Sequence, residues 1–345
     1  MTPLRAAVVG AGAFGRNHAR VIGDLENVDL AAVVDSDLAK AQQLASEFGS
    51  AAFASIEDLL GSVDAAIDAA VVATPTVTHE EVATRLIEFG IEVLVEKPIA
   101  ESSAAGDRLA RLAQERGRIL QVGHLERFNP AVAALQNALT IPLFFEVHRL
   151  SVFSPRSLDI DVVLDLMIHD LDIVLSFTGE HPVEIRAAGI SVLSKHVDIA
   201  NVRLAFASGC VANLTASRVS TEQVRKLRLF QPGEYISLDY QRQDAGRLAI
   251  RKNEPIQAPI GFVSQSALAA PPVGFVPQIG YEPLPVTHGE PLRLELEAFF
   301  ASVRDRSKPR VDGVQAVNAL RLAEAILVKI KEHSDLVADT IRLRS

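Results

Sequence analysis

The chain has 345 residues, a length that fits about two domains, and 48% of the residues are hydrophobic, which is enough for each domain to bury an apolar core. A formal net charge of −9 argues against a nucleic-acid or membrane-surface partner, because either would need a basic face. The single cysteine, Cys210, excludes an internal disulfide, and no apolar run is long enough to span a bilayer. The first residues lack the pattern of a signal peptide, so we expect a cytoplasmic α/β protein.

A glycine-rich turn, Gly10-x-Gly12-x-x-Gly15, follows an apolar strand predicted over residues 6–9. Gly10 allows a tight turn, Gly12 has no Cβ to keep a pyrophosphate off the backbone, and Gly15 lets the next helix approach the strand. The unpaired N–H groups at the start of that helix face the phosphates. Strand, turn and helix together predict a dinucleotide-binding site.

The second predicted strand ends in Asp35, twenty residues after Gly15. A carboxylate at this position accepts hydrogen bonds from the adenosine ribose and repels a 2′-phosphate, which favours NAD over NADP. Lys40 is the nearest following cation, and we expect it to point away from the site. The other cofactor contacts are expected from the glycine turn and from neighbouring strand ends: Gly10, Gly12, Ala13, Phe14, Gly15, Ser36, Thr74, Pro75, His79, Glu96 and Lys97.

Strand and helix patterns alternate over residues 1–122, which predicts βαβ units, a six-stranded parallel sheet and an N-terminal Rossmann domain. A helix through residue 48 begins after Ser36 or Asp37. Further helices are expected after three caps: Ser55, Thr78 with Glu81 as a capping box, and Ser102. Pro98 keeps Lys97 extended at the carboxyl end of the fifth strand, the edge where ligands bind in such sheets.

Residues 123–345 are expected to form a second α/β domain with a large, mostly antiparallel open sheet. Asn129-Pro130 begins one helix, and a largely buried helix is predicted over residues 162–177 and ended by Gly179. The proline-rich segment 253–291 has little periodicity and is interpreted as an arm or a lid. Two amphipathic helices, residues 292–306 and 313–333, finish the chain.

One face of this sheet is expected to need a partner. Val202, Leu204 and Phe206 lie on the same side of their predicted strand, so helices cover that side and leave the other open. We therefore expect a homodimer or homotetramer.

Asp165 and His169 lie four residues apart, on one face of the predicted helix. Burying them unpaired is expensive, so a solvated stripe or a satisfied core histidine is an equally good interpretation. As a pair they suit hydride transfer from an alcohol, because a base must remove the hydroxyl proton and histidine titrates near neutral pH. A metal site is less favoured, since no third ligand lies at a suitable spacing.

Lys97 also has two interpretations. It is a surface lysine paired with Glu96, or it lies beside an oxidised nicotinamide, where burial lowers its pKa and it hydrogen-bonds the reacting oxygen. His79 packs on the cofactor ribose or is solvated. His124 and Arg127 follow the domain junction, where we expect the cleft.

The chain resembles the Gfo/Idh/MocA oxidoreductase family over essentially its whole length. Four motifs carry the resemblance: Gly10-x-Gly12-x-x-Gly15, Ala73-Thr74-Pro75 with His79, Glu96-Lys97-Pro98, and Asp165-x-x-x-His169. The resemblance implies a Rossmann domain, a second domain whose open sheet often forms oligomer contacts, and catalytic roles for Lys97, Asp165 and His169. The sequence departs from the family's usual glycine-rich approach to this helix, with Ile160-Asp-Val-Val-Leu164 instead.

Residues 123–130 and Ser154-Pro-Arg156 resemble the branch of UDP-N-acetylglucosamine 3-dehydrogenases, which implies oxidation of the 3-hydroxyl of a UDP-N-acetylhexosamine. A diphosphate needs cations, and arginines are available near the expected cleft. The expected substrate contacts are Lys97, Arg127, Asn129, Arg156, Asp165, His169 and Arg218. The alternatives are a dehydrogenase of a free polyol or sugar, such as an inositol, and an NAD-binding sensor without turnover.

Overall fold

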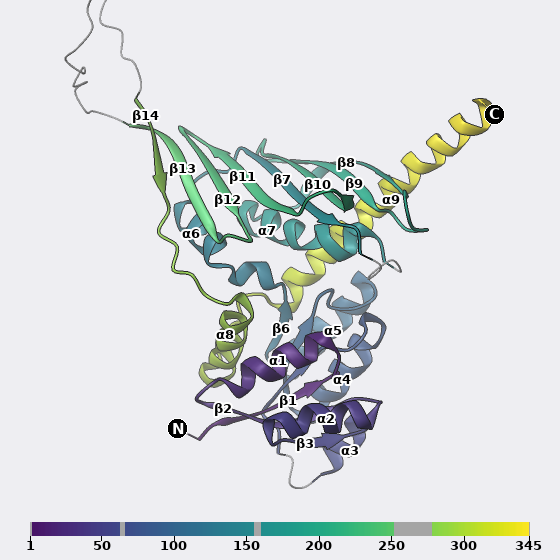
Figure 1. Ribbon diagram of the computed structural model, residues 1–345, viewed down its shortest axis with the longest axis vertical. Coiled ribbons are helices and arrows are strands. Elements are labelled where there is room, and N and C mark those ends of the chain that lie inside the picture. Colours follow the sequence, from purple (N-terminus) through teal and green to yellow (C-terminus); the bar gives the residue numbers. More distant parts are fainter. Residues whose placement is uncertain (1, 63–65, 155–159, 252–277, 345) are drawn as a thin grey trace, which may run out of the picture.

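The computed structural model describes residues 2–62, 66–154, 160–251 and 278–344 as two stacked bodies, each built on one sheet (Figure 1). The lower body has a six-stranded parallel sheet, and the upper body has an eight-stranded mixed sheet. This confirms the expected α/β class. No helix in the described part of the chain combines the length and apolar character needed to cross a membrane.

The lower sheet has the strand order β3-β2-β1-β4-β5-β6. Its strands are β1 (Leu4–Val9), β2 (Val28–Val34), β3 (Ala51–Phe53), β4 (Ala69–Val72), β5 (Glu92–Glu96) and β6 (Leu120–Gly123). Its flanking helices are α1 (Ala13–Gly23), α2 (Leu38–Phe48), α3 (Ile56–Gly61), η1 (Thr76–Thr78), α4 (His79–Phe89) and α5 (Ser103–Glu115). The order reverses between β1 and β4, so the ligand crevice is expected outside their carboxyl ends.

Most of the predicted caps are present in this body. Asp37, Ser55 and Ser102 each accept a main-chain N–H at the start of a helix. The capping box at Thr78 was wrong, although α4 begins where it was expected. The preceding η1 turn gives Thr78 a helical backbone, and its hydroxyl bonds Thr74 Oγ1 and Pro75 O at 2.8 Å instead.

The upper sheet has the order β14-β13-β12-β11-β7-β10-β9-β8, in which only β10 and β7 pair in parallel among the described strands. Its strands are β7 (Phe144–Val152), β8 (Pro182–Ile190), β9 (Ile199–Phe206), β10 (Val211–Ser220), β11 (Val224–Gln231), β12 (Glu234–Asp239), β13 (Asp244–Arg251) and β14 (Gln278–Pro283). The edge strand β14 belongs to the segment expected to be an arm or lid, and residues 252–277 lie outside the described part.

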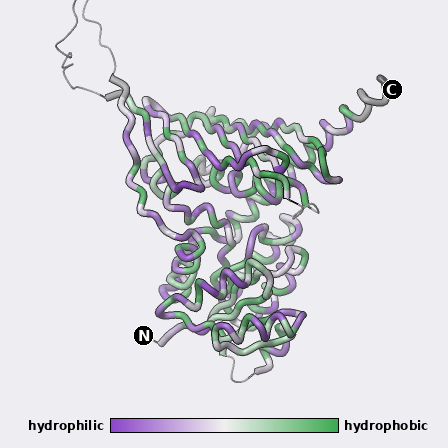
Figure 2. Tube along the Cα trace, viewed as in Figure 1, coloured by the Kyte–Doolittle hydropathy of each residue, from purple (hydrophilic) through white to green (hydrophobic). Residues whose placement is uncertain are grey.

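Helices cover one face of the upper sheet: α6 (Pro130–Ala138), η3 (Val163–Met167), α7 (Ile168–Thr178) and α9 (Gly313–Arg344). The short helix η2 (Leu125–Phe128) instead buries Phe128 in the core of the lower body. Val202, Leu204 and Phe206 are buried in the core on the helix-covered face of the upper sheet, as predicted. Polar and apolar residues alternate along these strands (Figure 2). The opposite face carries His148 and the exposed Phe230. The homo-oligomer stays a prediction.

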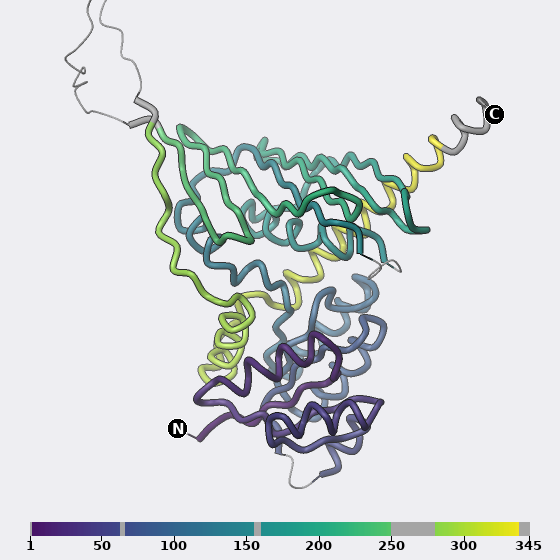
Figure 3. Tube along the Cα trace, in the orientation of Figure 1, coloured from purple at the N-terminus to yellow at the C-terminus, as the bar shows by residue number. Residues whose placement is uncertain are grey.

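The C-terminal helices connect the two bodies. The helix α8 (Pro291–Asp305) buries Leu296, Phe299 and Phe300 in the core beneath β1 and β2, in the lower body. The helix α9 packs Val317 and Leu320 on the lower body and then runs under the upper sheet (Figure 3). The division expected at residues 122 and 123 therefore does not account for α8, which completes the first core from the far end of the chain.

Two glycines of the first turn should differ in how strongly their substitution by alanine destabilises the protein. A Cβ at Gly15 would lie 1.7 Å from Gly10 O, whereas a Cβ at Gly12 would meet no atom within 4 Å. Gly15→Ala should lower the free energy of unfolding by about 1–3 kcal/mol, and Gly12→Ala by less than about 1 kcal/mol. Thermal melting of the two variants without cofactor measures this difference. Equal melting temperatures would contradict the close approach at Gly15.

Candidate functional site

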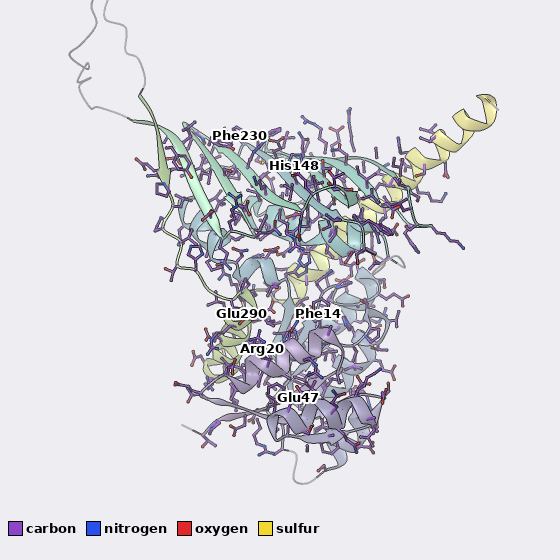
Figure 4. The ribbon with its side chains drawn as sticks, in the orientation of Figure 1. Phe14, Arg20, Glu47, His148, Phe230 and Glu290 are labelled. Carbon is purple, nitrogen blue, oxygen red and sulfur yellow. The ribbon has the colours of Figure 1, made fainter. Side chains whose placement is uncertain are left out.

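A cavity of about 720 Å³ lies at the carboxyl ends of β1, β2 and β4. Eight of the residues expected to contact a cofactor line it: Gly10, Gly12, Ala13, Phe14, Asp35, Ser36, Thr74 and Pro75. Phe14 is 64% exposed and lies at the end of α1 nearest the upper body (Figure 4). The size and position of the cavity fit a dinucleotide at the switch point of the sheet.

The Asp35 carboxylate connects the glycine turn to the end of β2. Its Oδ2 accepts the N–H of Ala11 at 2.7 Å, and its Oδ1 accepts the N–H of Asp37 at 2.9 Å. Each carboxylate oxygen has a second lone pair, so both remain able to accept a ribose hydroxyl. Asp35 therefore shapes the turn and faces the cavity at the same time.

Two cations also line this cavity. The expectation that Lys40 points away from the site was wrong: it borders the cavity, with Nζ 3.4 Å from Asp37 Oδ2. Arg85 reaches the same cavity from α4, where its Nε lies 3.6 Å from Glu57 Oε1. Sequence reasoning missed Arg85 because α4 is distant along the chain.

Three other residues expected to bind the cofactor instead support the walls of the cavity. Gly15 is buried behind the turn. His79 is 1% exposed, and its ring nitrogens lie 2.9 Å from Pro98 O and Thr74 O, which joins the ends of β4 and β5.

The third of these residues, Glu96, faces α1 through a contact that the sequence did not suggest. Its Oε1 lies 2.7 Å from Nε2 of the buried His18. Burial alone would raise the pKa of the Glu96 carboxyl, but His18 and the adjacent Lys97 hold it below its usual value.

Lys97 meets Asp165 across the junction of the two bodies. Lys97 Nζ donates to the main-chain oxygen of Asp165 at 2.7 Å and lies 3.8 Å from its Oδ1. Burial lowers the pKa of the Lys97 amine, and the charges of Asp165 and Glu96 partly oppose that shift. The ammonium is thus held at the carboxyl edge of the lower sheet, after β5, and the residues that follow the neighbouring strand β4 line the cofactor cavity.

The helix that carries Asp165 was expected to be α-helical throughout, and it begins with a π-helical turn instead. The turn spans Val163–Met167, and the N–H of Ile168 bonds the oxygen of Val163, five residues earlier. Gly179 ends the helix as predicted, in a left-handed conformation. Such turns are often found at functional sites, and this one contains Asp165, which Lys97 contacts.

His169 follows the π turn and is held neutral by its surroundings. Its Nδ1 is buried without a hydrogen-bond partner among the described residues, so Nε2 is the nitrogen left for a substrate hydroxyl. Burial, followed by the charges of Lys97 and Arg149, holds the pKa of His169 well below its usual value. The ring of His124 stands edge-on to it, with 6.3 Å between centroids. A neutral imidazole can accept a proton.

Arg149 pairs with two carboxylates, and one of them belongs to the residue that follows His169. The sequence did not predict this role for Arg149. Arg149 is 2% exposed, and its guanidinium contacts both oxygens of Asp170 at 2.7 and 2.9 Å and Glu126 Oε1 at 2.9 Å. Its carbon Cζ lies 5.0 Å from the centre of the Tyr240 ring. This network fixes the orientation of the helix segment next to His169.

Most of the residues expected to bind a substrate diphosphate are occupied within the protein. Arg127 pairs with Asp172 at 3.4 Å, and both are buried. Arg218 donates to Ile160 O and to Val197 O, and its Nε lies 3.5 Å from Asp198.

Asn129 is likewise committed to the fold. Its Oδ1 caps α6, and its Nδ2 donates to Tyr240 O at 3.0 Å. The remaining expected contact, Arg156, lies outside the described residues.

Comparison with known families matches both parts of the chain. Residues 4–124 match the family model described as "Oxidoreductase family, NAD-binding Rossmann fold" (GFO_IDH_MocA), and residues 149–230 match the GFO/IDH/MocA C-terminal domain. Together the two matches span the cofactor cavity, the Asp165 helix and the centre of the upper sheet.

Individual relatives and solved structures agree. The chain is 40% identical to UDP-N-acetylglucosamine 3-dehydrogenase of Acidithiobacillus ferrooxidans over 70% of this chain and 75% of that protein. A solved structure of that enzyme superposes with a TM-score of 0.84 over 96% of this chain and 99% of its own. The chain is also 25% identical to inositol 2-dehydrogenase of Rhizobium meliloti, over 95% of this chain and 97% of that protein. From the matched families and the similarity along the whole fold, we conclude that the chain belongs to the Gfo/Idh/MocA family of NAD(P)-binding dehydrogenases.

Proposed function

We propose that this protein oxidises a secondary hydroxyl of a sugar and passes the hydride to NAD. The observation that carries the proposal is the contact of 2.7 Å between Lys97 Nζ and the main-chain oxygen of Asp165, four residues before His169. Lys97 follows β5, which pairs with β4, and the residues after β4 line the cofactor cavity. The preferred substrate is a UDP-N-acetylhexosamine, reacting at its 3-hydroxyl. Support for that choice comes from the 40% identity to UDP-N-acetylglucosamine 3-dehydrogenase.

The three residues have complementary roles in this reaction. The bound nicotinamide supplies a hydride acceptor. The neutral His169 accepts the hydroxyl proton at Nε2 as the C–H bond breaks. The Lys97 ammonium donates a hydrogen bond to the reacting oxygen and stabilises its developing negative charge. Asp165 holds Lys97 in place and offers its carboxylate to the substrate.

Two alternatives remain distinct from this proposal. A polyol or free-sugar dehydrogenase would use the same three residues, and the similarity to inositol 2-dehydrogenase along almost the whole chain favours it as the second candidate. A non-catalytic NAD sensor is the less favoured alternative, because that function would assign no role to Lys97, Asp165 and His169.

A substrate screen tests the proposal directly. NADH formation should be seen with UDP-N-acetylhexosamines and be at least about tenfold slower with inositols and free sugars.

His169→Asn and Lys97→Met should each lower kcat about 10²–10⁴-fold, because each removes a proton-transfer or oxygen-stabilising group. Their NAD affinities should stay within about threefold of wild type. Near-normal turnover in both variants would refute the assigned roles, and activity with free sugars alone would refute the nucleotide-sugar substrate.

The pH dependence should reflect both lowered pKa values. His169 must be neutral to act as a base, so kcat/KM for oxidation should stay high as pH falls through about 6.5 and decline only below it. Lys97 must be protonated to donate, so the alkaline decline should begin below about 10.4. A primary deuterium isotope effect at each pH checks that hydride transfer is being measured. An acid limb above pH 6.5 would contradict the lowered pKa of His169.

NAD should bind more tightly than NADP, because Asp35 places a negative charge where NADP carries its 2′-phosphate. We expect a ratio of dissociation constants of about tenfold or more, which corresponds to about 1.4 kcal/mol of repulsion. Fluorescence titration with NADH and NADPH measures it. Asp35→Ala should reduce the ratio, and Lys40→Ala should increase it, because Lys40 lines the same cavity and attracts a phosphate. Equal affinities in the unaltered protein would overturn the preference.

A further inference from the structure

Arg225 lies on the helix-covered face of the upper sheet, at the end that meets the catalytic residues. Along β11 it precedes the fully buried Leu227 and Leu229 at alternate positions, so all three side chains share that face. Its partner across the strands is Arg149 of β7. Two arginines directly opposite each other on one face repel, and the pair needs compensating negative charge.

Arg149 has that compensation and Arg225 does not. The carboxylates of Asp170 and Glu126 both contact Arg149 within 2.9 Å, and the Asp165 carboxylate lies nearest to Lys97. In the described part of the chain, the Arg225 side chain has no ion pair, and its Nε is buried without a hydrogen-bond partner. Among the described residues Arg225 is therefore a partly buried guanidinium without an acceptor, which is costly in the free protein.

Arg225 is also near the catalytic residues, because Arg149, its cross-strand partner, bonds the carboxylate of Asp170, the residue that follows His169. Burial, followed by the charge of Arg149, lowers the pKa of Arg225, whereas Glu126, Asp170 and Asp165 oppose the shift. In turn, the charge of Arg225 is one of the causes that lower the pKa of His169. A sugar whose hydroxyl meets His169 would therefore have another part of its structure near Arg225.

We propose that Arg225 is an anion-binding residue of the substrate site, which holds a phosphate or carboxylate group of the same sugar whose hydroxyl lies at Lys97 and His169. The inference rests on the proposed dehydrogenase function. A guanidinium donates two parallel hydrogen bonds to either group, and the anion supplies the acceptor and the negative charge that the Arg149 and Arg225 pair lacks. Arg225 thus takes the place that the sequence suggested for Arg127 and Arg218, which are paired within the protein.

Binding to the NADH-loaded protein tests this without requiring turnover. Calorimetric titrations would use UDP as the phosphate source, glucuronate as the carboxylate source and N-acetylglucosamine as the neutral sugar. Arg225→Gln should raise the dissociation constant of one anion about 10- to 100-fold and leave that of the neutral sugar unchanged. Arg225→Lys should recover part of the loss. The anion that is affected identifies the chemical source, and either outcome supports the site.

The control is Arg242→Gln, which removes an arginine that is 76% exposed in the turn between β12 and β13 and should leave all three affinities unchanged. NADH affinity and melting temperature establish that each variant is folded. The proposal is overturned if Arg225→Gln binds both anions as tightly as wild type, or if wild type binds neither. Turnover separates the two proposals. Anion binding through Arg225 without oxidation of any sugar refutes the dehydrogenase function alone, whereas oxidation of a sugar by a protein whose Arg225→Gln variant binds both anions as tightly as wild type refutes the anion site alone.

Discussion

The contact between Lys97 and Asp165 is the interaction on which the candidate site depends. Lys97 follows β5 of the lower sheet, and Asp165 lies in the π turn beneath the upper sheet. Neither body contains a complete set of proton-handling groups by itself. Their alignment requires α9, because this helix packs on both cores and fixes one body relative to the other.

Burial lowers the pKa of both His169 and Lys97, and the charge of Arg149 adds to both shifts. Arg149 is held beside them by Asp170 and Glu126, so its positive charge persists in a buried position. Burying ions rarely adds stability, but it can shift the pKa of neighbouring groups toward the values that catalysis needs. The free energy that it costs to bury the charges of Arg149, Asp170 and Glu126 is therefore consistent with a role at a reaction site.

The walls of the cofactor cavity are held together by side-chain contacts that join different elements of the lower body. Asp35 holds the glycine turn through Ala11, and His18 joins α1 to Glu96 at the end of β5. Because the same elements that face the cofactor are connected to Lys97, movement of α1 would be transmitted to the catalytic edge. The expected cofactor residues thus divide into those that line the cavity and those that hold its lining in place.

Features that depend on neighbouring residues could be predicted from the amino-acid sequence. Gly10, Gly12 and Gly15 predict the turn, Asp37 and Ser102 predict helix starts, and alternating burial predicts the upper strands, because backbone conformation and side-chain periodicity are local properties. Which charged side chains lie close together could be seen only in the folded structure. Arg149 and Asp170 lie on different elements, Lys40 turns toward the cavity, Arg127 and Arg218 pair within the protein, and α8 completes the first core. Such contacts depend on how distant elements pack, and no periodic pattern along the chain records that packing.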